Sequence, residues 1–148
     1  MVVRRWPVRI TCASKQSVIA SRVKRTHFPS TYALCHCTDC KRRTGSAFGM
    51  SAYFSTTEII KQEGPTASYT FHNEEQGFDP TRHFCPTCGT TLFWHTSTLP
   101  KLVGIAADCF AGLLPGQPNV SVSDAKRCEW VSLPEQWIKI PHAVSVRG

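Results

Sequence analysis

Hydrophobic and polar residues of this chain alternate over short stretches, which is the period of a β-strand. Ten prolines and nine glycines interrupt the pattern, so few segments are long enough to form a stable helix. Alternation and β-branched content predict strands at residues 8–12, 17–23, 32–34, 47–54, 67–71, 90–95, 102–107, 129–133 and 137–140. The sequence therefore predicts a mainly β fold.

Two short helices are expected beside these strands. Residues 38–44 form one, and residues 56–61 form the other, in which Thr57 could cap the start. Residues 112–119 are rich in proline and glycine and predict a loop. A chain of 148 residues is one domain by default, so we expect a single small domain built of short antiparallel sheets.

Positive charge is concentrated at the N-terminal end. The formal net charge of +7 arises within residues 1–38, which contain seven Lys or Arg and no Asp or Glu, while the rest of the chain is electroneutral. We expect residues 1–30 to form a basic segment ahead of a domain at residues 31–143. The segment fits a first hairpin of that domain, a mitochondrial transit peptide, or a basic arm for nucleic acid or another polyanion. Because the charge is local, the fold as a whole is not expected to bind nucleic acid.

Composition narrows the class of protein further. With 41% hydrophobic and 18% charged residues the chain is too apolar for intrinsic disorder, and its apolar runs are too short to cross a bilayer, so no membrane partner is expected. No apolar stretch of secretory-signal length follows the first arginines. A cytoplasmic location is the expectation, with the mitochondrion as the alternative. In a reducing compartment, clustered cysteines indicate metal ligands.

Three of the eight cysteines, Cys35, Cys37 and Cys40, lie within six residues. A turn with this C-x-C-x-x-C spacing can gather three thiolates around one zinc ion, which prefers tetrahedral coordination. The fourth position would then be open to water or a substrate thiol. Because an open position is typical of a catalytic zinc, we predict a catalytic site here.

A second motif, CPTCG, places Cys85 and Cys88 at the spacing of a zinc knuckle, which is usually half of a closed structural site. An alternative combines this pair with Cys37 and Cys40 in one closed zinc-ribbon site. That alternative leaves Cys35 unexplained.

Together the two motifs resemble the glutathione-dependent formaldehyde-activating enzyme family, also called the centromere protein V family. The resemblance rests on CHCTDCKRRTGSAFG at residues 35–49 and RHFCPTCGTTLF at residues 82–93, and it extends to WIK at residues 137–139. It implies a mainly β fold around two zinc ions. One is a catalytic ion bound by three cysteines, here Cys35, Cys37 and Cys40, and the other is a structural ion bound by four.

The implied structural site departs from the family pattern. The family pairs the later C-x-x-C, here Cys85 and Cys88, with an early Cys-x-Cys-Gly. Alignment on Cys12 places Ser14 where the second early ligand belongs. A neutral hydroxyl is a poor replacement for a thiolate, so the ion would be left open or completed by water or a histidine. The resemblance thus implies a second zinc at three cysteines, with its fourth ligand unassigned.

The resemblance also implies an activity. Formaldehyde and glutathione add spontaneously to give S-hydroxymethylglutathione, so a catalyst need only bind the thiol, lower its pKa and hold the carbonyl beside it. The implied function is a zinc-dependent carbon–sulfur lyase that acts on this adduct or a related one. The alternative is a non-catalytic, zinc-stabilised binding module for a polyanion, chromatin or the cytoskeleton, in which protein ligands saturate every zinc.

A receptor for glutathione should place cations near the metal, because glutathione carries net negative charge. Lys41, Arg42 and Arg43 follow the last ligand directly and are the predicted binding residues. An exposed basic turn is the alternative role for all three. Arg82, beside the second motif, is a further candidate.

Other side chains near the motifs could complete a pocket. Phe48 and Trp94 are candidates for its lining, although aromatic residues at strand spacing are more often part of the core. His36 lies between two ligands, where it could hydrogen-bond a sulfur, relay a proton or simply face solvent. Cys109 and Cys128 belong to no motif and are expected to pack as small apolar residues.

Overall fold

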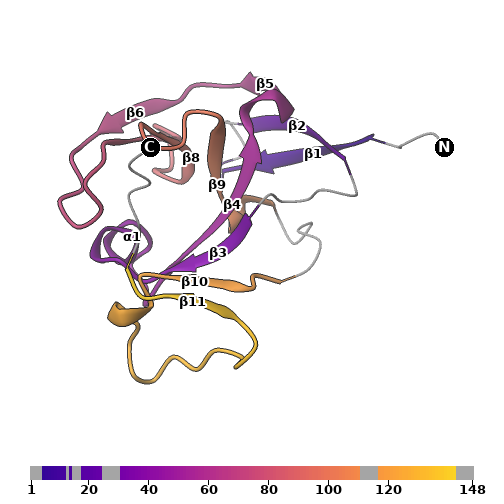
Figure 1. The fold of residues 1–148 in the computed structure, drawn as a ribbon. Coiled ribbons are helices and arrows are strands. Elements are labelled where there is room, and N and C mark those ends of the chain that lie inside the picture. Colours follow the sequence, from indigo (N-terminus) through magenta and orange to yellow (C-terminus); the bar gives the residue numbers. More distant parts are fainter. Residues whose placement is uncertain (1–4, 13, 15–17, 25–30, 111–116, 143–148) are drawn as a thin grey trace.

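The strands of the protein form two sheets in a computed structural model that describes residues 5–12, 14, 18–24, 31–110 and 117–142 (Figure 1). In spatial order, the smaller sheet consists of β1 (Arg5–Thr11), β2 (Val18–Lys24) and β5 (Ile59–Glu63). The larger sheet consists, again in spatial order, of β11 (Ile138–Ile140), β10 (Val120–Val122), β3 (Thr31–Cys35), β4 (Gly49–Ser55), β9 (Leu102–Ala106), β8 (Thr91–Thr96), β7 (Pro80–Phe84) and β6 (Ala67–Thr70). The predicted mainly β fold is confirmed.

Most strand pairs are antiparallel, but β10 runs parallel to both of its neighbours, β3 and β11. The helical elements are short: α1 (Thr38–Thr44) and the 3₁₀ turns η1 (Thr56–Glu58), η2 (Ala107–Phe110) and η3 (Asp124–Lys126). Among the described residues, no helix has the length and apolar character needed to span a membrane.

The hydrophobic core joins the two sheets. Phe54, Leu92 and Ile105 lie on neighbouring strands of the large sheet and are fully buried, and Phe110 of η2 packs on Phe54 with ring centroids 5.7 Å apart. Ile10 of β1 belongs to the same cluster. Burying a side chain of this size stabilises a fold by about 1.5–3 kcal/mol, so this cluster holds the sheets together.

The first two strands form an antiparallel hairpin. At the two ends of the paired stretch, Arg5 pairs with Lys24 and Thr11 pairs with Val18. The hairpin adds to the domain through β5. The predicted role of the basic segment 1–30, and its separation from residues 31–143, stay predictions.

Two predicted elements are wrong. Residues 129–133 form no strand: Val131 N–H donates to the Cys128 carbonyl in a turn, and Trp130 is exposed. The predicted helix at residues 56–61 is one 3₁₀ turn capped by Ser55, not Thr57, and the chain then enters β5 because Ile59 and the following residue favour a strand.

The pattern does not predict three of the strands, β5, β7 and β10, which are short or polar. β5 and β10 pair with strands distant in sequence, β2 and β3, whereas β7 pairs with its sequence neighbours β6 and β8. Of the predicted loop at residues 112–119, residues 117–119 have no regular structure, and the part up to residue 116 lies outside the described residues.

Candidate functional site

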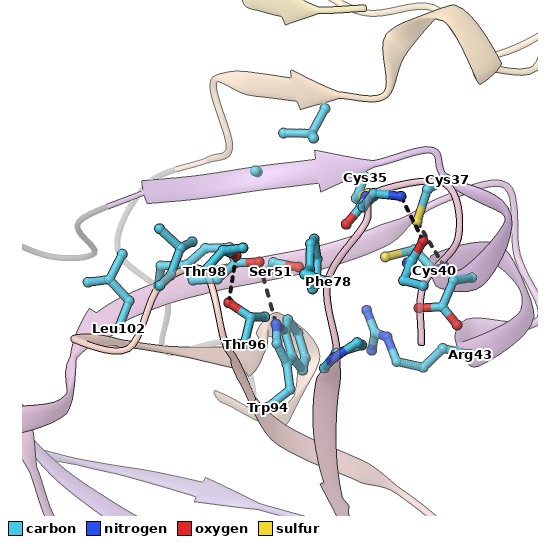
Figure 2. Close-up of a pocket in the computed structure, with 18 of the residues that line it drawn as sticks. Cys35, Cys37, Cys40, Arg43, Ser51, Phe78, Trp94, Thr96, Thr98 and Leu102 are labelled. Carbon is cyan, nitrogen blue, oxygen red and sulfur yellow. Dashed lines mark hydrogen bonds between the residues drawn. The ribbon is translucent and has the colours of Figure 1, made fainter. Parts of the chain in front are cut away.

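The first cysteine cluster lies where β3 ends and α1 begins. Cys35 is the last residue of β3, Cys37 caps α1, and Cys40 lies in its first turn, with its N–H donating to Cys37 Sγ at 3.3 Å. The three sulfurs lie within 4.8 Å of one another (Figure 2). The turn is anchored by the His36 N–H, which donates to the Val122 carbonyl on β10 at 2.9 Å.

The donors of this cluster are suited to a cation. Hydrogen bonds from Cys35 and Cys40 lower the pKa of the Cys37 thiol, so one thiolate forms readily. The hydrogen bond between Cys37 and Cys35 raises the pKa of the Cys35 thiol to about 11. The pKa of the Cys40 thiol is raised mainly through its hydrogen bond with Cys35. Three thiols this close cannot all ionise alone, whereas a zinc ion would stabilise three thiolates, so the residues present fit the metal.

The second cysteine cluster lies where the two sheets meet. Cys12 directly follows β1, while Cys85 and Cys88 belong to the turn between β7 and β8, and their three sulfurs also lie within 4.8 Å of one another. Gly89, with φ of 71°, lets this turn close, and its N–H donates to the Cys85 carbonyl at 2.8 Å. The cluster could therefore tie the small sheet to the large one through a metal ion.

Ser14 lies against the second cluster. Its hydroxyl lies 3.3 Å from Cys12 Sγ and 3.6 Å from Cys85 Sγ. Hydrogen bonds from Thr90 and then from Ser14 lower the pKa of the Cys88 thiol to about 5. The residue that departs from the family pattern thus lies in contact with two of the three cysteines.

The two C-x-x-C pairs lie in different clusters. Cys37 and Cys40 gather with Cys35, and Cys85 and Cys88 gather with Cys12. In the part of the chain that the structure describes, the single zinc-ribbon site considered from spacing is not formed.

A cavity of about 370 Å³ opens beside the first cluster. Figure 2 shows the three cysteines at one end with Arg43 pointing toward Trp94, and Thr96, Thr98 and Leu102 at the other end. The walls come from β3, β4, β8 and α1, together with the segment that leads into β7. The cavity is large enough for a small organic molecule whose reacting group faces the sulfurs.

Of the three predicted cations that follow the first motif, Arg43 lies in this cavity. Its guanidinium carbon is 4.7 Å from the centroid of the Trp94 ring, and among the described residues its buried Nη2 has no hydrogen-bond partner. Gly49 makes room for it, because a Cβ there would come within 2.5 Å of that nitrogen. A buried charged donor without a partner is costly, so the site favours an anionic ligand at this nitrogen.

Lys41, Arg42 and Phe48 do not line the cavity. Lys41 Nζ donates to the Lys126 carbonyl at 2.6 Å, and Arg42 is exposed. Phe48 packs against the His36 ring, with centroids 5.8 Å apart. A helix turns about 100° per residue. Of the three cations, Arg43, three residues after Cys40, is therefore the one that lies on the same face of α1 as Cys40.

Arg82 and Trp94 also line the cavity, and Arg82 is paired. Its guanidinium donates to the Asp39 carboxylate, and it lies 4.9 Å above the centroid of the Phe71 ring. Because this charge is already neutralised, Arg43 is the cation of the described lining that is free to bind an anion.

Sequence reasoning did not identify Asp39 or Tyr53 as cavity residues. The C-x-x-C motif itself contains Asp39, so its position could have been noticed. Tyr53 gives no local signal, because β4 alternates like any half-buried strand. What Tyr53 faces is defined by β9 beside it and by β8 on the far side of β9.

His36 does not face solvent. Its side chain is fully buried, and neither ring nitrogen has a hydrogen-bond partner of ordinary geometry among the described residues. Burial lowers the pKa of this histidine, and the nearby Ala47 backbone opposes that effect in part. The ring is therefore neutral at neutral pH and fills space behind the first cluster.

A small, mainly β protein with two cysteine clusters, one of them on a cavity wall, defines a class with two candidate zinc centres. The chain belongs to the glutathione-dependent formaldehyde-activating enzyme family, whose sequence profile matches residues 9–124. This confirms the resemblance drawn from the motifs. At the level of the family, it indicates formaldehyde-activating chemistry on glutathione-related small thiols.

The fold is similar to a solved structure. A crystal structure of a protein from Rhodobacter sphaeroides superposes with a TM-score of 0.56 at 19% sequence identity, covering 74% of this chain and 97% of that chain. The likeness supports the fold alone. A comparison with curated protein sequences gives no significant match.

Proposed function

We propose that this protein is a zinc-dependent carbon–sulfur lyase that forms or handles S-hydroxymethylglutathione or a related thiol adduct. The observation that supports this most directly is the presence of the Cys35, Cys37 and Cys40 sulfurs on a cavity wall. Among the described residues, no fourth Cys, His, Asp or Glu joins the group. A bound ion would therefore keep one position facing the cavity.

Cys35, Cys37 and Cys40 would hold the ion, and the chemistry it would supply is thiol capture, which lowers the pKa of the bound thiol. Because the three thiolate charges would outweigh that of the ion, activation of water would be less favourable. The protein residues orient the bound adduct, and the cavity walls limit the access of water to it.

Arg43 is the proposed anchor for the adduct. Its unpaired Nη2 can donate to a carboxylate of glutathione, and its stacking on Trp94 fixes the direction of that donor. Lys41 and Arg42 are left with the alternative role of an exposed basic turn.

The second cluster is proposed to hold a structural zinc. Cys12, Cys85 and Cys88 would supply three thiolates, and the Ser14 hydroxyl lies within reach of the fourth position. Both centres need reduced cysteines, which fits the cytoplasmic location expected from the sequence, with the mitochondrion as the alternative.

Cobalt substitution tests the proposed function. We expect glutathione to change the visible absorption of the cobalt protein, because its thiol would enter the coordination of the first cluster, whereas S-methylglutathione, which lacks a free thiol, should not. NMR exchange spectroscopy should show faster interconversion of formaldehyde and S-hydroxymethylglutathione with the zinc protein. An unchanged cobalt spectrum at saturating glutathione would favour the alternative, a binding module whose metal is saturated by protein.

Arg43 and Arg42 provide a matched pair of variants. Arg43→Met keeps most of the side-chain length on Trp94 but loses the donor, and we expect KM for the adduct to rise at least tenfold, because a charge-assisted hydrogen bond contributes about 1.5–3 kcal/mol. Arg42→Met, at an exposed position outside the cavity, should leave KM within twofold. Steady-state kinetics would measure both, and equal effects would contradict the role of Arg43.

A further inference from the structure

A row of three residues crosses three neighbouring strands at the cavity. Gly104 on β9 pairs with Tyr53 on β4 and with Trp94 on β8. A Cβ on Gly104 would lie 2.2 Å from Nε1 of Trp94. The absence of a side chain at this position therefore lets the indole lie across β9 and reach the strand beyond it.

The indole reaches the Tyr53 hydroxyl. Trp94 Nε1 lies 3.4 Å from Tyr53 Oη, and the two rings meet edge to face with centroids 6.3 Å apart. An indole nitrogen can only donate a hydrogen bond, so the tyrosine oxygen is the acceptor. The phenolic proton is left to donate elsewhere, and no acceptor for it is found among the described residues.

Tyr53 lines the cavity that also holds the first cluster. On β4, Tyr53 shares its face with Ser51 and Gly49, and the Cβ direction of Gly49 points at Cys40 and Arg43. Tyr53 and Cys40 line the same cavity. Trp94, which holds the Tyr53 hydroxyl, also carries the Arg43 guanidinium on its ring.

We propose that Tyr53 is a catalytic residue that donates a hydrogen bond to the oxygen of the thiol adduct. This inference rests on the proposed lyase function and names a group that acts in it. In an adduct the oxygen is two bonds from the sulfur, so a ligand whose sulfur is at the first cluster presents its oxygen to the cavity interior. A phenol is protonated at neutral pH and can serve there as a donor.

The proposed role follows from where charge develops. In the adding direction the thiolate electron pair forms the carbon–sulfur bond, and the carbonyl π pair moves onto oxygen, which becomes an alkoxide. Water then protonates the alkoxide and leaves hydroxide; the cleaving direction reverses these steps. A donor fixed beside that oxygen stabilises the charge as it forms, and removing one such donor typically lowers kcat by about 10²–10³-fold.

Trp94 is a positioning residue in this arrangement. It does not contact the reacting oxygen but fixes the tyrosine oxygen, so its effect should be smaller. Trp94→Phe keeps an aromatic ring beneath Arg43 but removes the Nε1 donor together with part of the buried indole. We expect a reduction in kcat of less than about tenfold, with KM nearly unchanged.

The test compares Tyr53→Phe with Tyr69→Phe, since Tyr69 is exposed on β6 and lies outside the cavity. For Tyr53→Phe we expect kcat for adduct cleavage to fall about 100-fold, while glutathione affinity, read from the cobalt spectrum, stays within twofold. Tyr69→Phe should match the wild type in both measurements. Thermal unfolding of each variant would show whether Tyr53→Phe remains folded, and Trp94→Phe gives an independent readout of the same donor.

The outcomes separate this inference from the proposed function. If the wild type cleaves the adduct and Tyr53→Phe retains kcat within twofold, the lyase function stands and the role of Tyr53 is overturned. A Tyr53→Phe variant that loses glutathione affinity in proportion to activity would likewise overturn it, because the residue would then act in binding. A wild type without lyase activity overturns the proposed function itself.

Discussion

Replacing Cys40 with serine is expected to reduce lyase activity by more than about 100-fold while leaving the protein folded. Removing a residue that hydrogen-bonds to a metal ligand typically lowers metal affinity or activity 10–100-fold. A larger effect is expected for Cys40, because it is proposed as a ligand itself. A serine hydroxyl is neutral and binds zinc poorly. The fold should tolerate the change, because α1 contributes no buried residue to the core.

Cys128→Ser is the matched control for this variant. Cys128 is half-buried but belongs to neither cysteine cluster, so its replacement should leave activity within twofold. Metal analysis should show about one zinc fewer in Cys40→Ser than in Cys128→Ser. Full activity in Cys40→Ser would contradict the assignment of the first cluster as catalytic, and unfolding of this variant would assign that cluster a structural role.

The cysteine clusters could be predicted from the sequence because most of their ligands are close together in the chain. A C-x-C-x-x-C turn brings its own thiols together, and a C-x-x-C turn does the same for a pair. The helix at residues 38–44 was also predictable. Its periodicity separates Arg43 from Lys41 and Arg42, because Arg43 is three positions after Cys40 and returns to the same face, whereas the other two cations do not.

The cavity could not be predicted in the same way, because its walls depend on strand order. Tyr53 comes from β4, which is distant in sequence from β7 and β8, the strands of Arg82 and Trp94, and the pattern does not predict β7 as a strand. Gly104 gave no signal either. Its role becomes visible only once β9 lies between β4 and β8, where the missing side chain lets an indole cross the strand.

The same limitation applies to Ser14. Sequence alignment could identify it as a departure from the family pattern, but could not show what occupies the place of the missing thiolate. The hydroxyl reaches the cluster because Cys12 follows β1 and the core brings that strand to the turn between β7 and β8. One serine is thereby placed where it can modulate a link between the two sheets.

Cys88→Ser and Ser14→Cys are expected to change stability in opposite directions. A structural zinc contributes about 10–16 kcal/mol, which is comparable to the 5–15 kcal/mol stability of a whole domain. Cys88 is exposed, so its replacement removes a ligand without disturbing the core. We expect Cys88→Ser to lose its cooperative thermal unfolding transition at zinc concentrations where Cys40→Ser retains it, as measured by circular dichroism.

Ser14→Cys should instead strengthen the second site, because it supplies a fourth thiolate at the place of the hydroxyl. We expect at least about tenfold tighter zinc binding, equivalent to about 1.4 kcal/mol, and a rise in Tm of about 3–6 °C in zinc-buffered solution. Combining it with Cys40→Ser isolates this site, and Ser68→Cys, exposed on β6, controls for an added thiol. If Ser14→Cys changes neither zinc affinity nor Tm relative to Ser68→Cys, the fourth position of the site does not lie at residue 14.

If Cys88→Ser unfolds no more readily than Cys40→Ser, the second cluster is not the metal link between the sheets.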